Sequence, residues 1–189
     1  QPSFRGESVK LQLDKELSAG IDHLTKQLQT TPNVVFLAAF QLLQHRYSGA
    51  EDVWVGSPVS IRSRTEMQQM IGFLNETLIF RCSFQPGDTF NKLVARLKPA
   101  TERALNENDV AFEDLVEKLK PERFGGWNPL FQTMFVYNAE GETPTLPAGL
   151  TMTDEMVDLG TSKFDLTLFA TRNAGSYDLS LEFAKDLFK

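Results

Sequence analysis

This sequence of 189 residues has few histidines and cysteines that could act in catalysis or bind a metal ion. The two histidines are His23 and His45, and the single cysteine is Cys82. Neither histidine has a serine, a cysteine or a pair of carboxylates at a spacing typical of a catalytic triad or a metal site. We therefore expect structural or surface roles for both histidines, and for Cys82 the role of a small buried apolar side chain. No glycine motif of the phosphate-binding types is present either.

The stretch "MIGFLNETLIFR", residues 70 to 81, raises a different possibility. Its apolar residues suit a buried strand, but the polar residues Asn75, Glu76 and Thr77 interrupt them. The residues alone leave two interpretations open, a bend that faces solvent or a polar lining of a site. A carboxylate at this place is the feature that needs an explanation.

Composition limits the kinds of protein that this chain can be. A hydrophobic content of 41% over 189 residues is enough for the core of one domain. The net charge of -6 and the dispersed basic residues argue against a nucleic-acid partner. A lone cysteine excludes an internal disulfide and suits a reducing compartment. With no apolar run of about 20 residues and no signal-peptide pattern, we expect a soluble cytoplasmic protein.

Hydrophobic periodicity predicts a mixed α/β fold that carries these residues. Strands are expected within residues 8–13, 51–60, 77–84 and 129–138, and in a hairpin over 163–184 with its turn at 173–176. Helices are expected within residues 15–28, 30–49, 89–106 and 111–119. The Gly- and Pro-rich segment 139–149 is expected to be a surface connection.

Capping residues predict where these helices begin and end. Asp14 and Thr31 are expected N-caps, and Gly49 is expected to end the second helix. Asp88 is the expected cap of the helix within 89–106, and Pro99 should kink or divide that helix. The first residue is glutamine, so we interpret the sequence as an excised piece of a longer chain.

Five stretches of the chain carry motifs in a fixed order. The stretches are "FLAAFQLLQHRYSGAEDVWVGSPVSIRSR", "MIGFLNETLIFR", "ENDVAFEDLVEKLKPER", "WNPLFQTMFVYN" and "GTSKFDLTLFATRNAGSYDLSLEFAKDLF". They resemble the C-terminal half of the condensation domains of nonribosomal peptide synthetases. The first four are similar to the family motifs Gly-x-Pro-Val-x-x-Arg, Ile-Gly-x-Phe-Val-Asn-Thr, His-Gln-Asp-x-Pro-Phe-Glu and Arg-Asn-Pro-Leu-Phe-Gln-x-Met-Phe. The fifth resembles the closing strands of the family.

The resemblance implies a chloramphenicol acetyltransferase-like lobe, an α/β fold with a mixed sheet flanked by helices. Residues 1–189 would be the C-terminal subdomain, without the N-terminal lobe and the terminal helices. The family forms an amide between acyl and aminoacyl thioesters, which donor and acceptor carrier proteins present on phosphopantetheine arms. Such enzymes make secondary metabolites, including antibiotics. The implied partners are the N-terminal lobe and the two carrier proteins, with no nucleic acid and no membrane.

The resemblance assigns supporting roles to residues of this chain. Gly72, Phe73, Leu74, Asn75, Glu76 and Thr77 match the segment that lines the tunnel floor. Arg62 matches the arginine that contacts the other lobe through an ion pair, although a surface arginine beside Arg64 is the alternative. Asn128 and Pro129 match the motif that starts the central strand. No catalytic residue, metal ligand or bound cofactor is expected, because the family's His-His-x-x-x-Asp-Gly motif does not occur in this chain.

Several positions depart from the family motifs. Asn75 and Glu76 stand at the usual places of Val and Asn, Glu107 replaces His or Asn, and Ala111 replaces Pro. Phe124 and Trp127 replace an Asp and an Arg. These departures leave two main functions open: a lobe of an amide-forming enzyme that is inactive by itself, or a degenerate non-catalytic module that recruits a carrier protein or a tailoring enzyme. The epimerisation and heterocyclisation relatives of the family are a third alternative, which the retained Asn-Pro-Leu-Phe-Gln and Phe-Glu motifs of the amide-forming type disfavour.

Overall fold

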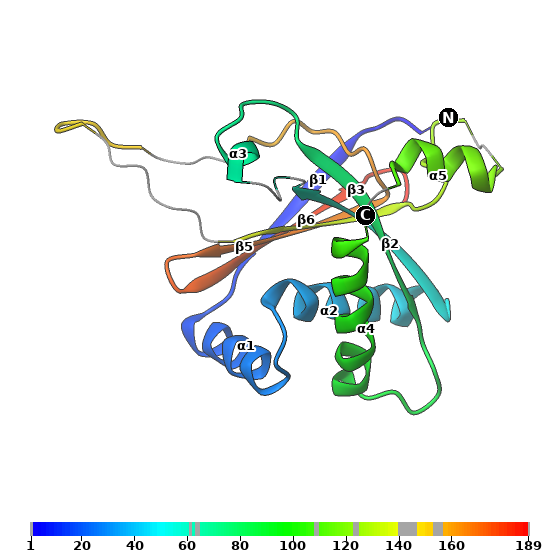
Figure 1. Ribbon diagram of the computed structural model, residues 1–189, viewed down its shortest axis with the longest axis horizontal. Coiled ribbons are helices and arrows are strands. Elements are labelled where there is room, and N and C mark those ends of the chain that lie inside the picture. Colours follow the sequence, from blue (N-terminus) through cyan, green and yellow to red (C-terminus); the bar gives the residue numbers. More distant parts are fainter. Residues whose placement is uncertain are drawn as a thin grey trace.

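In the part of the chain that the structure describes, a mixed sheet of six strands has helices on both of its sides (Figure 1). The computed structural model describes residues 2–60, 62, 65–107, 110–122, 125–139, 147–152 and 157–188, except for the side chains of residues 65 and 68. The strands are β1 (Gly6–Gln12), β2 (Asp52–Ser60), β3 (Asn75–Ser83), β4 (Thr133–Asn138), β5 (Leu166–Asn173) and β6 (Ser176–Ala184). The helices are α1 (Lys15–Gln27), α2 (Pro32–Ser48), α3 (Thr65–Gln68), α4 (Phe90–Asn106) and α5 (Phe112–Leu119). The expected mixed α/β fold is confirmed.

The strand order across the sheet is β1-β6-β5-β4-β2-β3. The central strand β4 is parallel to β2 and β5, whereas the other neighbouring pairs are antiparallel. Ala174 and Gly175 connect β5 to β6 with φ values of 44° and 83°. Two consecutive positive φ values are typical of the tight turn that joins antiparallel strands, so the predicted hairpin is confirmed.

The hydrophobic core lies between the sheet and the three helices α1, α2 and α4, which share one face in Figure 1. Helix α2 is apolar around most of its circumference, and Leu37 and Phe40 on it are at most 1% exposed. The strands contribute Val55, Phe135 and Tyr177, which are fully buried. Helices α3 and α5 lie on the other side of the sheet (Figure 1).

Three of the predicted helix ends are confirmed. Asp14 accepts a hydrogen bond from the Leu17 N–H at 2.7 Å, and the Thr31 hydroxyl accepts one from the Val34 N–H at 3.4 Å. Gly49 ends α2 in the left-handed conformation, with φ of 71°. A residue without a Cβ adopts this conformation at little steric cost.

The prediction that Asp88 caps α4 is wrong. Thr89 has the extended backbone of an N-cap, and its hydroxyl accepts from the Lys92 N–H at 3.3 Å. Asp88 instead accepts from the Gln85 N–H at 2.9 Å and pairs with Arg96 at 2.6 Å. Pro99 lies inside α4 without dividing it.

Strand boundaries also differ from the predictions. β3 begins at Asn75, so the polar residues open the strand instead of interrupting it. β4 begins at Thr133, four residues later than expected, because the preceding "PLFQ" forms a turn. Only 139 and 147–149 of the expected surface connection belong to the described residues. Where the chain is described, none of its helices is long and apolar enough to cross a membrane.

Candidate functional site

The segment before β3 has most of its apolar side chains exposed. Met70 is 53% exposed, Phe73 is 91% exposed and Ile71 is fully exposed. Gly72, between Ile71 and Phe73, is also exposed. Large apolar side chains in such a group are typical of a surface that meets another surface. The expected tunnel segment is therefore a loop that leads into a strand.

Glu76 lies in the second position of β3, and its carboxylate points to a helix end. The Glu76 Oε1 atom accepts a hydrogen bond from the backbone N–H of Phe112 at 3.1 Å. Phe112 is the first residue of α5, and the preceding Ala111 has no side-chain capping bond. The first N–H groups of a helix have no partner inside the helix. A carboxylate from a distant strand thus occupies the place of the missing cap.

Arg62 follows β2 and turns its guanidinium to the backbone of the same loop. Its Nη1 donates to the carbonyl oxygens of Met67, at 2.9 Å, and of Met70. Its Nη2 donates to the carbonyl oxygen of Gly72 at 3.2 Å. Both terminal nitrogens of Arg62 therefore contact the loop in this structure. Arg64, the neighbour considered in the sequence, lies outside the described residues.

Phe131, in the fourth motif stretch, contacts residues of three others. Its ring lies so close to the backbone of Gly56 that a Cβ atom there would be 2.2 Å from the ring. The same ring makes an edge contact with Phe112 at 5.8 Å and stacks on Phe164 at 5.5 Å. Phe131 itself is 2% exposed. One buried ring thus connects four of the five motif stretches.

Asn128 holds the turn that delivers Phe131. Its Oδ1 atom accepts from the N–H groups of Leu130, at 3.0 Å, and Phe131, at 3.2 Å. Its carbonyl oxygen accepts from Gln132 at 3.1 Å. This is the local side-chain bonding that favours asparagine in turns. Pro129, the other predicted support residue, is partly buried in this turn.

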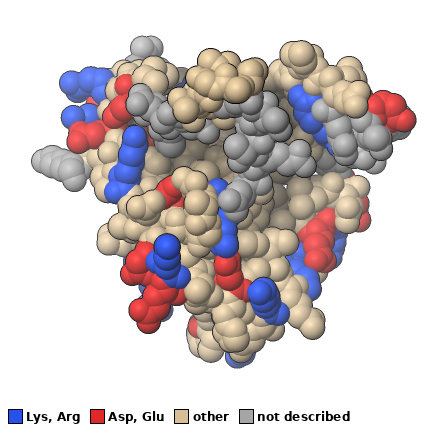
Figure 2. Space-filling view, turned by 90° about the vertical axis from the view of Figure 1, so that its left-hand side faces the viewer, with Lys and Arg blue, Asp and Glu red and all other residues tan. Residues whose placement is uncertain are grey.

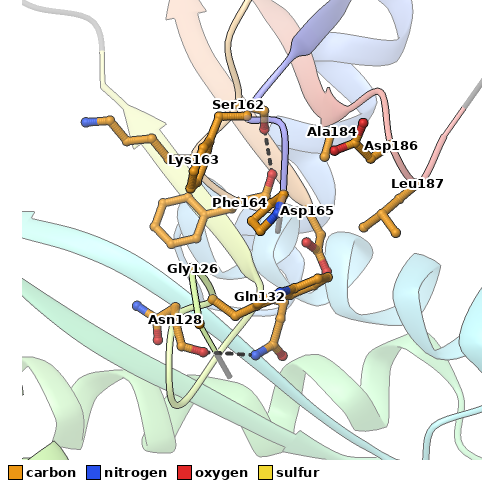
Figure 3. Close-up of a pocket in the computed structure, with 14 residues that line it drawn as sticks. Gly126, Asn128, Gln132, Ser162, Lys163, Phe164, Asp165, Ala184, Asp186 and Leu187 are labelled. Carbon is orange, nitrogen blue, oxygen red and sulfur yellow. Dashed lines mark hydrogen bonds between the residues drawn. The ribbon is translucent and has the colours of Figure 1, made fainter. Parts of the chain in front are cut away.

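A pocket of about 440 Å³ lies beside this turn (Figure 3). Residues 125–128 and Gln132 line one part of it. The N-terminal residues Pro2 and Phe4, the residues just before β5, and the end of β6 with the residues after it line the rest. Burial raises the pKa of the Asp165 carboxyl group in its wall. The Lys163 side chain points away from this carboxylate in Figure 3. Asp165 was not predicted as a site residue. Its only distinguishing feature in the sequence is that this carboxylate residue lies between two apolar residues.

Asp165 and Gln132 also line a second, larger hollow of about 1020 Å³. Its wall is mostly apolar and comes from the last turns of α2, the start of β2, the turn before β4, the start of β5 and the end of β6, with Val9 of β1. Leu43, Leu166, Leu181 and Phe183 are among the apolar residues that line it. The hollow borders α2, and neither Arg62 nor Glu76 lines it.

The positions of the histidines are compatible with the structural or surface roles expected of them, and Cys82 is buried as expected. His45 Nδ1 lies 2.7 Å from the Ala50 carbonyl oxygen, and its ring stacks on Phe84 at 4.2 Å. His23 is exposed on α1. Cys82 is 2% exposed, and burial raises the pKa of its thiol. Within the described ranges, no group of three or more His, Cys, Asp or Glu side chains could hold a metal ion.

Comparison with known proteins identifies the family of this chain. The family description "Condensation domain" matches residues 1–189, the whole chain. The chain belongs to the condensation-domain family. It is 38% identical over 180 residues to a linear gramicidin synthase of Brevibacillus parabrevis, and 34% identical over 187 residues to bacitracin synthase 3 of Bacillus licheniformis. These matches cover 94% and 99% of the chain but only 4% and 3% of the two synthases.

Solved structures of condensation domains share the fold. A four-domain nonribosomal peptide synthetase bound to AMP and glycine matches 100% of the chain, over 16% of its own length, with a TM-score of 0.88 and 22% identity. The X-domain from teicoplanin biosynthesis matches 100% of the chain, over 44% of its own length, with a TM-score of 0.86 and 25% identity. The predicted chloramphenicol acetyltransferase-like fold is thereby confirmed.

Proposed function

We propose that this condensation-family chain is the C-terminal lobe of a domain that forms amide bonds. The donor would be an acyl thioester and the acceptor an aminoacyl thioester, both held on the phosphopantetheine arms of carrier proteins. The acceptor amine attacks the donor thioester carbonyl, and the donor arm leaves as a thiol. The chain would contribute the tunnel floor and the contact with the other lobe, and we assign it no catalytic residue, metal or cofactor of its own.

One observation carries the proposal: the family motifs, far apart in the sequence, meet in a continuous set of contacts. Arg62 bonds to Gly72, and Glu76 bonds to Phe112. Phe112 contacts Phe131, which packs on Gly56. If the motif residues had unrelated roles, such contacts between different motifs would not be expected. The contacts suit a rigid support for Gly72 to Thr77 as the tunnel segment.

A support of this kind is useful for this reaction. Two tethered substrates gain most of their rate from being held at the right distance and orientation in a channel with little water. A lobe can therefore be essential for amide formation without supplying a proton-transfer group. The carrier proteins would deliver the thioesters, so the lobe needs only to shape the channel.

We also propose that the loop 70–74 forms part of the contact with the N-terminal lobe. The exposed Ile71 and Phe73 would be buried when that lobe is in place. Arg62 was expected to make an ion pair across the lobes, and that pair stays a prediction. In the present structure its terminal nitrogens contact the loop instead, so Arg62 would act on the interface mainly through the loop.

The surface gives no reason to invoke nucleic acid as a partner. On the face in Figure 2, positive and negative side chains are interspersed instead of being gathered by sign. The net charge is -6. A nucleic-acid groove needs a continuous basic surface. We propose a cytoplasmic protein that acts on carrier proteins and not on a membrane.

Amide formation by the complete parent domain tests the proposal. The domain is mixed with an acyl-loaded donor carrier and an aminoacyl-loaded acceptor carrier, and the mass of the acceptor is followed. We expect the acyl group to move to the acceptor, more slowly in Asn75→Ala and at the normal rate in Glu102→Ala, an exposed control on α4.

The alternative, a module that only recruits other proteins, predicts a different result. Carrier binding without any acyl transfer by the complete parent domain would favour it and would reject the amide-forming proposal. A broken His-His-x-x-x-Asp-Gly motif in the parent would agree with that outcome.

A further inference from the structure

We propose that Arg62 and Glu76 are positioning residues that fix the two ends of the loop 70–74. This inference rests on the proposed function, because the loop would belong to the reaction tunnel. It differs from an ion pair across the lobes for Arg62 and from a direct substrate contact for Glu76. Both side chains would act on the reaction through the backbone that they hold.

The Arg62 end of the loop is held by hydrogen bonds that the Arg62 guanidinium donates to backbone carbonyl groups. The three acceptors are the backbone oxygens of Met67, Met70 and Gly72. The first belongs to α3, a helix of only four residues, which is too short to be stable by itself. A planar guanidinium can span several acceptors at once, whereas an ammonium is a compact point charge. Arg62 therefore ties a short helix and the loop after it to the end of β2.

The Glu76 end of the loop is held by a hydrogen bond that the Glu76 carboxylate accepts from a helix N-terminus. The carboxylate bonds to the Phe112 N–H, and a negative charge is favourable at this end of a helix. Helix α5 has eight residues, and Ala111 offers no side-chain cap of its own. Phe112 in turn packs on the buried ring of Phe131. Glu76 is thus connected to the interior of the molecule through one hydrogen bond and one ring contact.

Packing does not hold the loop between these two ends. Ile71 and Phe73 are almost completely exposed, and Met70 is half exposed. Burial of apolar area, the usual stabilising force, contributes little here. The pairing of β3 with β2 begins at Asn75, and the polar contacts of the two charged side chains add to it in holding the ends of the loop.

Amide hydrogen exchange of the chain tests the positioning directly, whether or not the parent makes amides. The variants are Arg62→Ala, Arg62→Lys, Glu76→Ala and Glu76→Gln, with Arg103→Ala and Glu102→Ala as exposed controls on α4. Loss of the bond to Glu76 should speed exchange of the Phe112 amide about tenfold in Glu76→Ala. Loss of the Arg62 bonds should speed exchange of the Met70 amide, which donates to the Met67 carbonyl at 3.2 Å, by a similar factor in Arg62→Ala. Glu76→Gln keeps an acceptor oxygen and should restore most of the protection, and Arg62→Lys should restore only part. Unchanged exchange in Arg62→Ala and Glu76→Ala would overturn the inference.

Steady-state kinetics of the complete parent domain distinguish positioning from a merely structural role. We expect kcat to fall about tenfold or more in Arg62→Ala and Glu76→Ala, because small displacements of positioning groups have large effects on rate. KM for both loaded carriers should change less than about twofold, and Glu76→Gln should keep most of kcat.

Faster exchange together with an unchanged kcat would overturn the positioning role. Absence of amide formation in the unmodified parent would instead reject the proposed function, and the exchange experiment would still decide whether the two side chains hold the loop. The two failures are therefore distinguishable.

Discussion

The ring of Phe131 lies directly on the backbone of Gly56, where a Cβ atom would be 2.2 Å from its Cε2 atom. Phe131 is 2% exposed and packs between Phe112 and Phe164. The ring therefore cannot move aside without disturbing both neighbours. Glycine at this position of β2 is required by the close approach of the ring and not by the backbone conformation.

Gly56→Ala should lower the free energy of unfolding by about 1–3 kcal/mol, the usual effect of overpacking. Urea titration followed by circular dichroism measures this change. Gly20→Ala on α1 is the matched control, because outside its chain neighbours and the backbone of its own helix no described atom lies within 4 Å of the added methyl group. That control should be neutral or stabilising by about 0.4–1 kcal/mol. Equal effects of the two substitutions would contradict the role of the ring contact.

Asp22 connects α1 to the β5–β6 hairpin. Its Oδ1 atom lies 2.7 Å from Arg172 Nη1 and accepts from the Tyr177 hydroxyl at 2.7 Å. The hydrogen bond from Arg172 lowers the pKa of Asp22 below its usual value. A lowered pKa in the folded state stabilises the protein above the unfolded pKa of about 3.9, and this stability is lost as pH falls through the folded pKa.

Asp22→Asn should therefore be destabilised relative to the wild type at pH 7, by about 1–2 kcal/mol. The difference should shrink as the pH falls from about 4 through the lowered folded pKa, because protons bind the carboxylate first in the unfolded chain and then in the folded protein. Unfolding by urea at several pH values measures the difference, with Glu102→Gln as the exposed control. A difference that stays constant from pH 7 to pH 2 would show that the ionised carboxylate is not responsible.

Asp165 should have the opposite pH dependence. Burial raises its pKa, so ionisation is less favourable in the folded state than in the unfolded chain. Stability should fall as pH rises from the unfolded value of about 3.9 through the raised folded value. Asp165→Asn should remove this loss and raise the melting temperature relative to the wild type at pH 7. A variant that melts below the wild type at neutral pH would refute this explanation.

Cys82 should react slowly with thiol reagents in the folded protein. The side chain is 2% exposed, and burial raises the pKa of its thiol, so little thiolate is available. Labelling with a chromogenic disulfide reagent should be at least about tenfold slower than in urea-unfolded protein. Labelling at the same rate in both states would place the thiol at an accessible surface.

Local patterns in the sequence were sufficient for much of the fold. The caps Asp14 and Thr31 and the stop at Gly49 were predicted correctly, because each depends on residues within one helical turn. The hairpin turn at Ala174 and Gly175 was likewise readable from neighbours. Asp88 was misassigned because both it and Thr89 are good capping residues, and the sequence does not say which one has the extended backbone.

Tertiary structure alone decided what the polar residues of "MIGFLNETLIFR" do. From the sequence, Glu76 could have faced solvent or lined a site, since both are compatible with its neighbours. Its partner Phe112 lies 36 positions away, and the partners of Phe131 include Gly56, 75 positions away. No local propensity encodes such contacts, because they exist only after the sheet has brought distant segments together. The motif order determined the family, whereas the packed fold decided which motif residues support which others.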